Sequence, residues 1–255
     1  MLIAQKRAKM RNLNSVIWII DWIENLPLLG LGNFQLVLCS GVLHHLKNPE
    51  KGLKITNDMQ STDGGADVMV YGKYGRTGVY ILQTVLSIIN KSERSLAKEL
   101  KNAKAILTAL SEDHWLSPNS FGDLVEMTDS GIYDLLLHKR DVSFSVTEVY
   151  EWTEKSGYTF IDYSEPDQRL AISLGNKISE ETLFNKAIKM GIPKQRSIGE
   201  ILYGNIIKQD IYLYITIYDC ASLEMSVMKR SYDEEFGHIS VQLLLKLSTM
   251  TKTGS

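Results

Sequence analysis

Residues 34–46 constrain the fold of this 255-residue chain more than any other stretch. They read FQLVLCSGVLHHL, an apolar run typical of a β-strand that ends at small residues and continues into a helical pattern. An apolar run without polar alternation is typical of a strand buried in a parallel sheet. Open α/β sheets bind their ligands at the carboxyl ends of such strands. The stretch therefore predicts an α/β fold with a ligand site beside Cys39, Ser40 and Gly41.

The surrounding sequence predicts a parallel crossover unit. A helix over residues 43–59, broken at Pro49, separates the strand at 34–39 from another buried strand at 66–71. Strand, helix and strand in this order are typical of right-handed parallel units. The other elements that we expect are a basic surface helix at 1–11, a buried strand at 16–20, a loop at 27–32, a turn at 63–65, helices within 79–110, a loop at 117–122, a helix at 146–157, a strand at 158–163, a helix opening at 179–181, a helix at 197–207 and a strand at 211–218.

The composition limits the classes of function that the chain can serve. Its formal net charge is −2, so it lacks the strongly basic surface that is typical of nonspecific nucleic-acid binding. Its two cysteines, Cys39 and Cys220, lie far apart and form no disulfide framework, which suits a reducing compartment. The longest apolar runs fall short of the ~20 residues that a membrane-spanning helix needs. We therefore expect a cytoplasmic or nuclear protein that does not associate with membranes.

Two motifs resemble class I S-adenosylmethionine-dependent methyltransferases. The string Val42-Leu-His-His-Leu46 resembles the segment after the fourth strand of that family. The string Asp21-Trp-Ile-Glu-Asn-Leu-Pro27 matches the family's spacing of an Asp and an apolar residue ahead of Leu-Pro. The resemblance covers about residues 1–218. It implies a Rossmann-like methyltransferase sheet, S-adenosyl-L-methionine as cofactor, and methyl transfer to an acceptor that the sequence does not identify.

The resemblance also implies which residues contact the cofactor. Asp21 would accept a hydrogen bond from the exocyclic amine of adenine, and Trp22 would pack on the plane of the base. The alternative for Asp21 is that it caps the following turn. Small residues at a strand end let a ligand approach the backbone. The remaining cofactor contacts implied are Cys39, Ser40, Gly41 and His45.

The adjacent histidines His44 and His45 do not predict a metal site. Neighbouring helical positions point about 100° apart, so the pair is unsuited to chelating one ion. His114, His138 and His238 have no cysteine or histidine neighbours at ligand spacing. We expect no metal site, and a structural role for His44.

The segment that follows the strand at 66–71 contains candidates for binding the methyl acceptor. It reads YGKYGRTGVY, and a similar string follows the fifth strand in some members of the resembled group. That similarity implies that Tyr71, Tyr74 and Arg76 lie beside the acceptor. A hinge into the next helix is an equal alternative. Phosphate binding is disfavoured, because neither Gly-x-x-x-x-Gly-Lys-Ser/Thr nor Gly-x-Gly-x-x-Gly is present.

Asp134 and His138 are the candidates for catalysis. They are four positions apart and share one face if this segment is helical. Such a pair can orient or deprotonate an acceptor. A surface hydrogen bond is the alternative reading. The resembled group carries a similar Asp-Leu-x-Leu-His string, which favours the catalytic role.

The glycine-rich turn of the resembled family is absent from this chain. Family members place a strand, a Gly-x-Gly-x-Gly turn and a second strand ahead of the counterpart of residues 1–11. We therefore expect a sheet that lacks the family's first two strands, in an N-terminally truncated chain. We also expect weak or absent binding of S-adenosylmethionine, because the backbone of that turn comes close to the cofactor. The alternative function is that of a catalytically inactive fragment that serves as an interaction module.

The loss of these strands has consequences for partners. The strand at 34–39 would expose an unpaired edge, unless residues 16–20 pair with it, and open edges promote self-association. As methyl acceptor we favour a small molecule or a protein over a nucleic acid. The four parts that we expect are a partial methyltransferase core at 1–78, a helical insertion or lid at 79–145, the remainder of the core at 146–218, and a segment of uncertain structure at 219–255.

Overall fold

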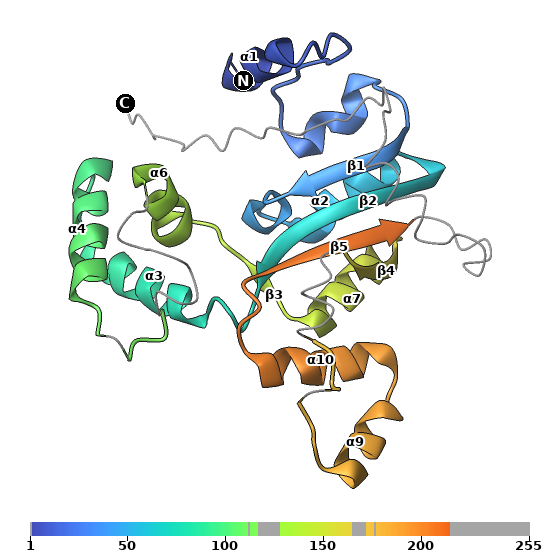
Figure 1. Cartoon of the computed structure of the whole chain (residues 1–255). Coiled ribbons are helices and arrows are strands. Elements are labelled where there is room, and N and C mark those ends of the chain that lie inside the picture. Colours follow the sequence, from blue (N-terminus) through green and yellow to red (C-terminus); the bar gives the residue numbers. More distant parts are fainter. Residues whose placement is uncertain (1, 112, 117–127, 165–171, 176, 215–255) are drawn as a thin grey trace.

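A computed structural model describes residues 2–111, 113–116, 128–164, 172–175 and 177–214 (Figure 1). The predicted loop at 117–122, the end of the last predicted strand and the segment 219–255 lie outside the described residues. Within the described ranges, no helix combines the length and the apolar character needed to cross a membrane.

The centre of the structure is a five-stranded sheet. Its strands are β1 (Phe34–Ser40), β2 (Gln60–Gly72), β3 (Ser143–Phe144), β4 (Thr159–Tyr163) and β5 (Lys208–Tyr214). The strand order is β1-β2-β5-β4, and β3 pairs with β2 off this path. β1 and β3 run parallel to β2, whereas β5 runs antiparallel to both β2 and β4. The predicted strands at 34–39 and 66–71 and their parallel crossover are confirmed.

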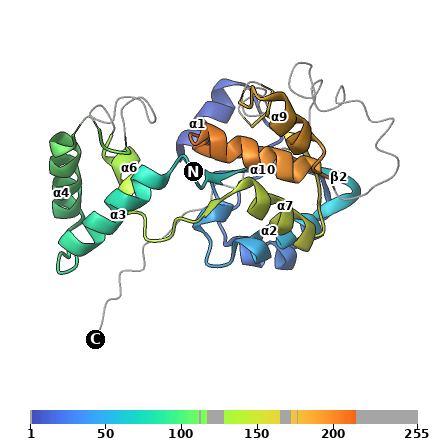
Figure 2. The ribbon, with the colours of Figure 1, turned by 90° about the horizontal axis from the view of Figure 1, so that it is seen from below.

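Two helices cover one face of the sheet and form the main core with it. They are α2 (Pro49–Asp58) and α7 (Val146–Lys155), which lie on the same side of the sheet in Figure 2. Alternate residues of β2 point to this face, and Val68 is fully buried there. Trp152 of α7 stacks on Phe144 at 4.8 Å between ring centroids. Side chains of β1, β2 and β5 belong to the same hydrophobic cluster as those of α2 and α7.

The ends of these two helices are set by local sequence. The Asn48 side chain accepts a hydrogen bond from the amide of Lys51, and Pro49 opens α2, so the predicted break is confirmed. At α7, Ser145 and Glu148 form a reciprocal capping box. Gly157 follows α7 with φ +80°, as the helix prediction for 146–157 expects.

A second group of helices lies beside the carboxyl ends of β1 and β2 (Figure 1). It comprises α3 (Thr77–Ile89), α4 (Leu96–Ala109), α6 (Asp129–Ile132) and the π-helical turn η4 (Tyr133–Leu137). We call this group the helical insertion. It has its own hydrophobic cluster, which consists of Val79, Leu82, Leu86, Ala103, Leu116, Ile132, Leu135 and Leu136. The helices predicted within 79–110 are confirmed.

The glycines between β2 and α3 serve close backbone packing. A Cβ atom on Gly75 would lie 2.4 Å from the carbonyl oxygen of Ile206, and one on Gly78 would lie 2.5 Å from the amide of Leu116. Neither glycine has a positive φ. Close approach of another backbone segment therefore explains both glycines, and phosphate binding stays the disfavoured interpretation.

Residues 16–20 do not form the buried strand that their β-branched pattern predicts. They pair with no strand among the described residues, and Ile17 and Ile20 are 74% and 54% exposed. β-propensity takes effect only beside neighbouring strands, and the described part of the chain places none beside this segment. In the described part of the chain β1 pairs only with β2, so the edge of the sheet stays open.

Two glycines predicted to form a turn lie inside β2 instead. The pairing steps from Phe34 opposite Gln60 to Leu36 opposite Gly65, so β2 carries an irregularity next to β1. Glycine within a strand is typical of such bulges. The turn predicted at 63–65 is therefore wrong.

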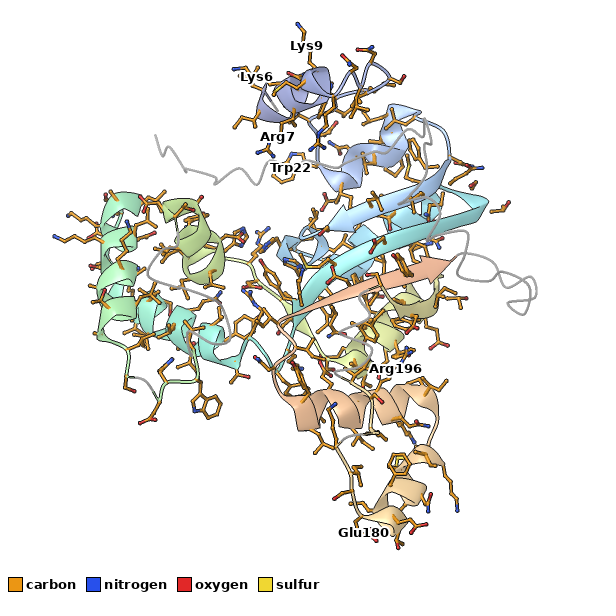
Figure 3. The ribbon with its side chains drawn as sticks, viewed as in Figure 1. Lys6, Arg7, Lys9, Trp22, Glu180 and Arg196 are labelled. Atoms are coloured by element: carbon orange, nitrogen blue, oxygen red, sulfur yellow. The ribbon has the colours of Figure 1, made fainter. Side chains whose placement is uncertain are left out.

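The amino-terminal segment is helical. The helix α1 (Leu2–Met10) confirms the predicted surface helix, and Lys6 and Lys9 point away from the rest of the molecule (Figure 3). Pro27, predicted to lie in a loop, falls inside the 3₁₀ helix η1 (Ile23–Leu29). This helix stops at Gly30, which has φ +61°.

Two further helices precede β5. The helix α9 (Glu181–Ile188) confirms the predicted helix opening, although Glu180 and not Ser179 caps it. The helix α10 (Ile192–Tyr203) begins earlier than the prediction of 197–207, because Pro193 suits a first helical turn. Arg196 of α10 binds Asp162 of β4 at 2.5 Å between Nη2 and Oδ1, which ties α10 to the edge of the sheet.

Candidate functional site

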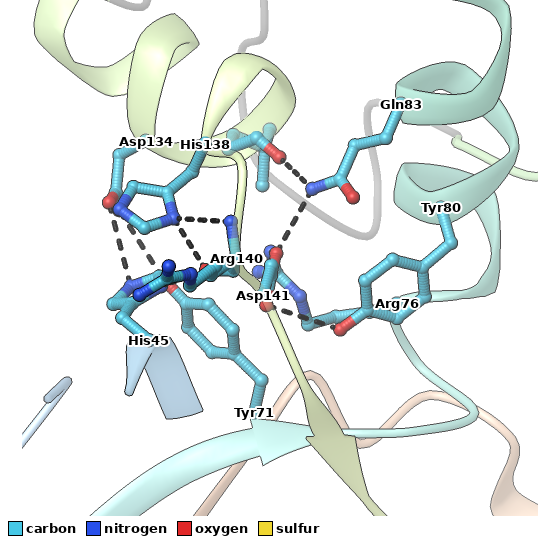
Figure 4. Close-up of polar contacts among 10 residues, drawn as sticks. His45, Tyr71, Arg76, Tyr80, Gln83, Asp134, His138, Arg140 and Asp141 are labelled. Carbon is cyan, nitrogen blue, oxygen red and sulfur yellow. Dashed lines mark hydrogen bonds and ion pairs between the residues drawn. The ribbon is translucent and has the colours of Figure 1, made fainter. Parts of the chain in front are cut away.

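Polar and aromatic side chains meet where the carboxyl ends of β1 and β2 face the helical insertion (Figure 4). β1 leads into the short helix η2 (Leu43–His45), β2 ends beside Tyr71, and the insertion contributes η4 and the segment after it. We call this group the strand-end cluster. It consists of His44, His45, Tyr71, Arg76, Tyr80, Gln83, Asp134, His138, Arg140 and Asp141. The structure thus brings together five of the predicted site residues, which are His45, Tyr71, Arg76, Asp134 and His138.

Tyr71 lies at the centre of the strand-end cluster. Its ring stacks on His44 at 3.7 Å between centroids, and the guanidinium carbon of Arg76 lies 3.5 Å from its centroid on the ring face. Its hydroxyl donates a hydrogen bond to Oδ2 of Asp134 at 3.3 Å. Burial, followed by the nearby Asp134 carboxylate, raises the pKa of Tyr71. The phenol therefore stays protonated and acts as a hydrogen-bond donor.

Arg76 forms a buried ion pair that fastens the insertion to the sheet. Its Nη2 lies 2.7 Å from Oδ2 of Asp141, and the two side chains are only 2% and 1% exposed. Asp141 also accepts hydrogen bonds from Gln83 at 3.0 Å and from the hydroxyl of Tyr80 at 3.4 Å. Several partners of this kind are what a buried carboxylate requires. Sequence reasoning missed the role of Asp141, because its partner lies 65 residues away.

His45 is held by the backbone of the segment after η4. Its Nδ1 lies 2.8 Å from the carbonyl oxygen of Arg140, and its Nε2 lies 3.8 Å from Oδ1 of Asp134. The ring of His138 packs at 4.1 Å between centroids. Burial lowers the pKa of His45. The arrangement presents a neutral imidazole next to a carboxylate.

Asp134 and His138 do not share one helix face as their spacing suggests. Asp134 lies in the π-helical turn η4, whereas His138 follows it with an extended backbone at φ −66° and ψ 127°. Both side chains nevertheless reach His45. The Asp134 side chain is 56% exposed, so it is accessible to a ligand. Their catalytic role stays a prediction.

His44 is fully buried against Tyr71. Neither of its ring nitrogens has a hydrogen-bond partner within the described ranges. Burial, with smaller contributions from His45 and Arg76, lowers the pKa of His44 to about 2. The ring is therefore neutral and serves as a stacking surface, in keeping with the structural role expected from the sequence.

The residues at the end of β1 differ in accessibility. Cys39 is 1% exposed, and burial raises the pKa of its thiol to about 12, so only its backbone can face a ligand. Ser40 is exposed, and Gly41 has φ +74° with its amide donating to the carbonyl of Met69 at 3.2 Å. Ser40 and Gly41 thus leave the backbone open at this edge, which suits close approach of a ligand.

The two residues implied to contact adenine lie at the start of η1. Oδ1 of Asp21 accepts hydrogen bonds from the amide of Trp22 at 2.8 Å and from Nδ2 of Asn25 at 2.7 Å. This is the turn-capping role that sequence analysis left open. Trp22 is 50% exposed (Figure 3), which leaves much of its ring free to stack. Tyr74 is 37% exposed, and its carbonyl accepts from the hydroxyl of Thr77 at 2.7 Å.

An open groove of about 350 Å³ runs between the start of α2 and α7. Its lining mixes Lys47 and Lys155 with Glu50, Glu148 and Glu151, and includes none of the predicted site residues. The candidate functional site is therefore the strand-end cluster. Among the residues that the structure describes, no group of three or more His, Cys, Asp or Glu side chains is arranged to hold a metal ion.

Comparisons with known proteins give a fold and no family. No protein-family model matches the chain. An uncharacterized protein of Synechococcus sp. is 24% identical over 147 residues, which are 54% of this chain and 34% of that protein.

Two solved structures of PKMT2 from Rickettsia typhi are similar to this chain. The complex with AdoHcy has a TM-score of 0.63 at 16% sequence identity and covers 85% of this chain and 42% of PKMT2. The other structure has a TM-score of 0.60 at 16% identity and covers 88% and 43%. The chain thus spans well under half the length of the proteins that it matches. At this identity the likeness concerns the fold alone: the chain has a mixed α/β, Rossmann-like fold similar to that of PKMT2.

Proposed function

We propose that this chain is part of a class I methyltransferase that moves a methyl group from S-adenosylmethionine to an unidentified acceptor. The observation that carries the proposal is the fold similarity to PKMT2, whose structure holds AdoHcy, at a TM-score of 0.63. The position of the strand-end cluster supports it, because α/β sheets bind ligands at the carboxyl ends of their strands. The net charge of −2 favours a small molecule or a protein as acceptor over a nucleic acid. Truncation and a cytoplasmic location stay predictions.

Some of the described residues near the end of β1 are suited to bind S-adenosylmethionine. S-adenosylmethionine supplies a methyl carbon activated by a positively charged sulfur. Ser40 and Gly41 would accept it close to the backbone, and Trp22 has an exposed ring surface for the base. Oδ2 of Asp21 makes no hydrogen bond within the described part of the chain and would take the adenine amine. His45 would line the same pocket.

The acceptor would lie beside the Tyr71 hydroxyl and Asp134, between the sheet and the insertion. Asp134 is exposed there and would contact it directly, together with His138 and Tyr74. The Arg76 side chain is 2% exposed and pairs through Nη2 with Asp141, so in this proposal it positions Tyr71 and does not bind the acceptor. The protein would thus contribute alignment and desolvation, which are the main needs of an in-line displacement.

Calorimetric titration with S-adenosylmethionine and with AdoHcy tests cofactor binding by the 255-residue chain. We expect weak or no binding, because no Gly-x-Gly-x-Gly turn is present to approach the cofactor. An affinity in the micromolar range would contradict this expectation.

Incubation of the protein with methyl-labelled S-adenosylmethionine and a cell lysate tests activity. Label transferred to lysate components, above a heat-inactivated control, would support the enzyme. The proposal would be overturned if no label were transferred either by the 255-residue chain or by a longer chain that carries a glycine-rich turn.

The open edge of β1 favours a second candidate function, that of an inactive interaction module. β1 pairs only with β2 in the described part of the chain, and apolar side chains are exposed on β1 and on the preceding η1, including Leu36 at 37% and Leu28 at 82%. Exposed apolar surface of this kind is typical of a binding face. Pull-downs that recover the same partner with and without S-adenosylmethionine would favour the module over the enzyme.

A further inference from the structure

The hydrogen bond between His45 and Arg140 decides where the proton of the His45 ring lies. A backbone carbonyl oxygen only accepts hydrogen bonds, so Nδ1 of His45 must donate at the observed 2.8 Å. In the neutral ring, Nε2 then carries a lone pair and no proton. This assignment follows from the chemistry of the carbonyl group and needs no assumption about a ligand.

The lone pair of Nε2 faces a second acceptor. Oδ1 of Asp134 lies 3.8 Å away, which is longer than a hydrogen bond. The other oxygen of this carboxylate, Oδ2, already accepts from the hydroxyl of Tyr71. No donor in the described part of the chain reaches Oδ1. Nε2 of His45 and Oδ1 of Asp134 are therefore two neighbouring hydrogen-bond acceptors, and a ligand that donates N–H or O–H hydrogen bonds would be complementary to them.

Burial keeps His45 neutral and able to accept a proton. The side chain is 3% exposed, and burial is the main cause of its lowered pKa. Charged and polar groups from several elements also shift the pKa of His45. His138 lowers it, whereas the carbonyl of Arg140 and the carboxylates of Asp134 and Asp141 raise it. The rings of His44 and Tyr71 also pack against it, at 4.2 Å and 5.7 Å between centroids.

We propose that Nε2 of His45 and Oδ1 of Asp134 bind an N–H or O–H group of the methyl acceptor, and that His45 takes its proton during transfer. The inference rests on the proposed function and names the substrate class, an amine or a hydroxyl compound. It also gives His45 a proton-accepting role in addition to the cofactor contact that the resemblance implies.

In this step one bond to the methyl carbon would form as another breaks. The lone pair of the acceptor nitrogen or oxygen would form the new bond, and the electron pair of the carbon–sulfur bond would go to sulfur. The proton of the acceptor passes to Nε2 of His45. The resulting imidazolium is stabilised by the Asp134 carboxylate at 3.8 Å, while the carbonyl of Arg140 keeps the ring oriented.

Nitrogen-15 NMR of histidine-labelled protein tests the proton assignment without any cofactor. We expect His45 in the Nδ1–H tautomer at pH 7, with a pKa below its ordinary value. The Asp134→Asn substitution should lower that pKa further, because the carboxylate favours the charged ring. Asp129→Asn is the matched control: Asp129 is an exposed carboxylate of the same insertion that pairs with Lys104, and its loss should leave His45 unchanged. An Nε2–H tautomer or a charged ring at pH 7 would overturn this inference alone.

Methyl transfer, measured with a longer chain that carries a glycine-rich turn because the 255-residue chain is expected to bind the cofactor weakly or not at all, supplies the second readout. His45→Asn keeps a donor for the carbonyl of Arg140 and removes Nε2, so we expect a ~10²–10⁴-fold loss of rate. The pH profile of the unsubstituted protein should rise through the pKa that NMR measures for His45. Mass spectrometry should locate the methyl group on nitrogen or on a hydroxyl oxygen. A base-labile methyl ester would overturn the inference, since a carboxylate has no proton to give up. Absence of any transfer with both the 255-residue chain and a longer chain that carries a glycine-rich turn would overturn the proposed function, whereas the tautomer measured by NMR tests the role of His45 by itself.

Discussion

At the scale of single residues, the structure contains a buried pair of charged side chains that belongs to neither hydrophobic cluster. Arg76 and Asp141 are almost fully buried and pair at 2.7 Å. Such a pair adds little net stability relative to apolar residues, but either partner alone is costly to bury. The pair therefore specifies how the insertion sits on the sheet.

Asp141→Asn should destabilise the protein by about 3–5 kcal/mol, because it leaves the Arg76 guanidinium buried without a counter-charge. Urea unfolding followed by circular dichroism measures the change. Asp58→Asn is the control, since it breaks the Lys54–Asp58 pair, whose side chains are 60% and 51% exposed. Exposed pairs of this kind contribute at most ~1 kcal/mol. Equal losses in the two variants would contradict the assignment.

Glu200 is a buried carboxyl between α10 and α7. Its Oε2 accepts a hydrogen bond from the amide of Val146 at 2.7 Å, and its Oε1 has no partner among the described residues. Burial raises the pKa of Glu200 from the ordinary 4.5 to about 7, although the Val146 amide opposes the rise. The folded protein therefore binds a proton at Glu200 more tightly than the unfolded chain does.

The bound proton at Glu200 therefore stabilises the fold at low pH. This stabilisation is lost as pH rises from about 4.5 to about 7, because the folded state gives up the proton at about pH 7. Glu200→Gln keeps an acceptor for Val146 and removes the charge. At pH 8 we expect this variant to exceed the unsubstituted protein in unfolding free energy by roughly 1–3 kcal/mol, at ~1.4 kcal/mol per pKa unit. Urea titrations at pH 4.5 and pH 8 measure the difference. A pH dependence that is the same in both proteins would refute the role of Glu200.

At the scale of elements, the ends of helices follow local sequence, whereas the edge of the sheet does not. Asn48 caps α2 and Ser145 caps α7, directly before the predicted break at Pro49 and the predicted start of a helix at 146. β1, in contrast, keeps a free edge in the described part of the chain, because residues 16–20 do not pair with it. Unpaired edges are templates for another strand.

We propose that the chain self-associates through β1. Sedimentation velocity at rising protein concentration should show a dimer, and Leu36→Lys should weaken it by placing a charge beside the edge. Leu96→Lys is the matched control, because Leu96 lies on α4, away from β1, and is 50% exposed. A protein that stays monomeric at tens of micromolar, or equal effects of the two substitutions, would contradict the proposal.

At the scale of the whole molecule, two hydrophobic clusters lie side by side. One joins the sheet to α2 and α7, and the other lies within the helical insertion. The strand-end cluster lies at their junction, where Arg76 and Asp141 connect them (Figure 4). Separate clusters of this kind can open separately.

Leu86→Ala should therefore loosen the insertion more than the sheet. Leu86 is 1% exposed in the insertion cluster, and truncation of a buried leucine costs ~2–5 kcal/mol. Hydrogen exchange measured by mass spectrometry should show protection falling in α3 and α4 while it persists in β2. An equal fall in all three elements would show that the clusters unfold as one.

Much of the fold could be predicted because it depends on short-range patterns. The apolar strands at 34–39 and 66–71, the break at Pro49 and the helix ending before Gly157 all follow from residues within a few positions of one another. The resemblance to methyltransferases added the Rossmann-like fold, which the PKMT2 structures support. Of the predicted site, five residues meet in the strand-end cluster, although their roles stay predictions.

Most strands and helices lie where local patterns in the sequence predict them, because hydrogen bonds within a turn and the period of apolar residues are local properties. The packing of the folded chain selects which of these segments find partners. It left residues 16–20 exposed despite their β-branched side chains, and filled the space beside Gly75 with the backbone of Ile206. It also set the carbonyl of Arg140 2.8 Å from Nδ1 of His45, 95 residues earlier in the chain. Burial and pairing depend on neighbours distant in the chain, which no local pattern specifies.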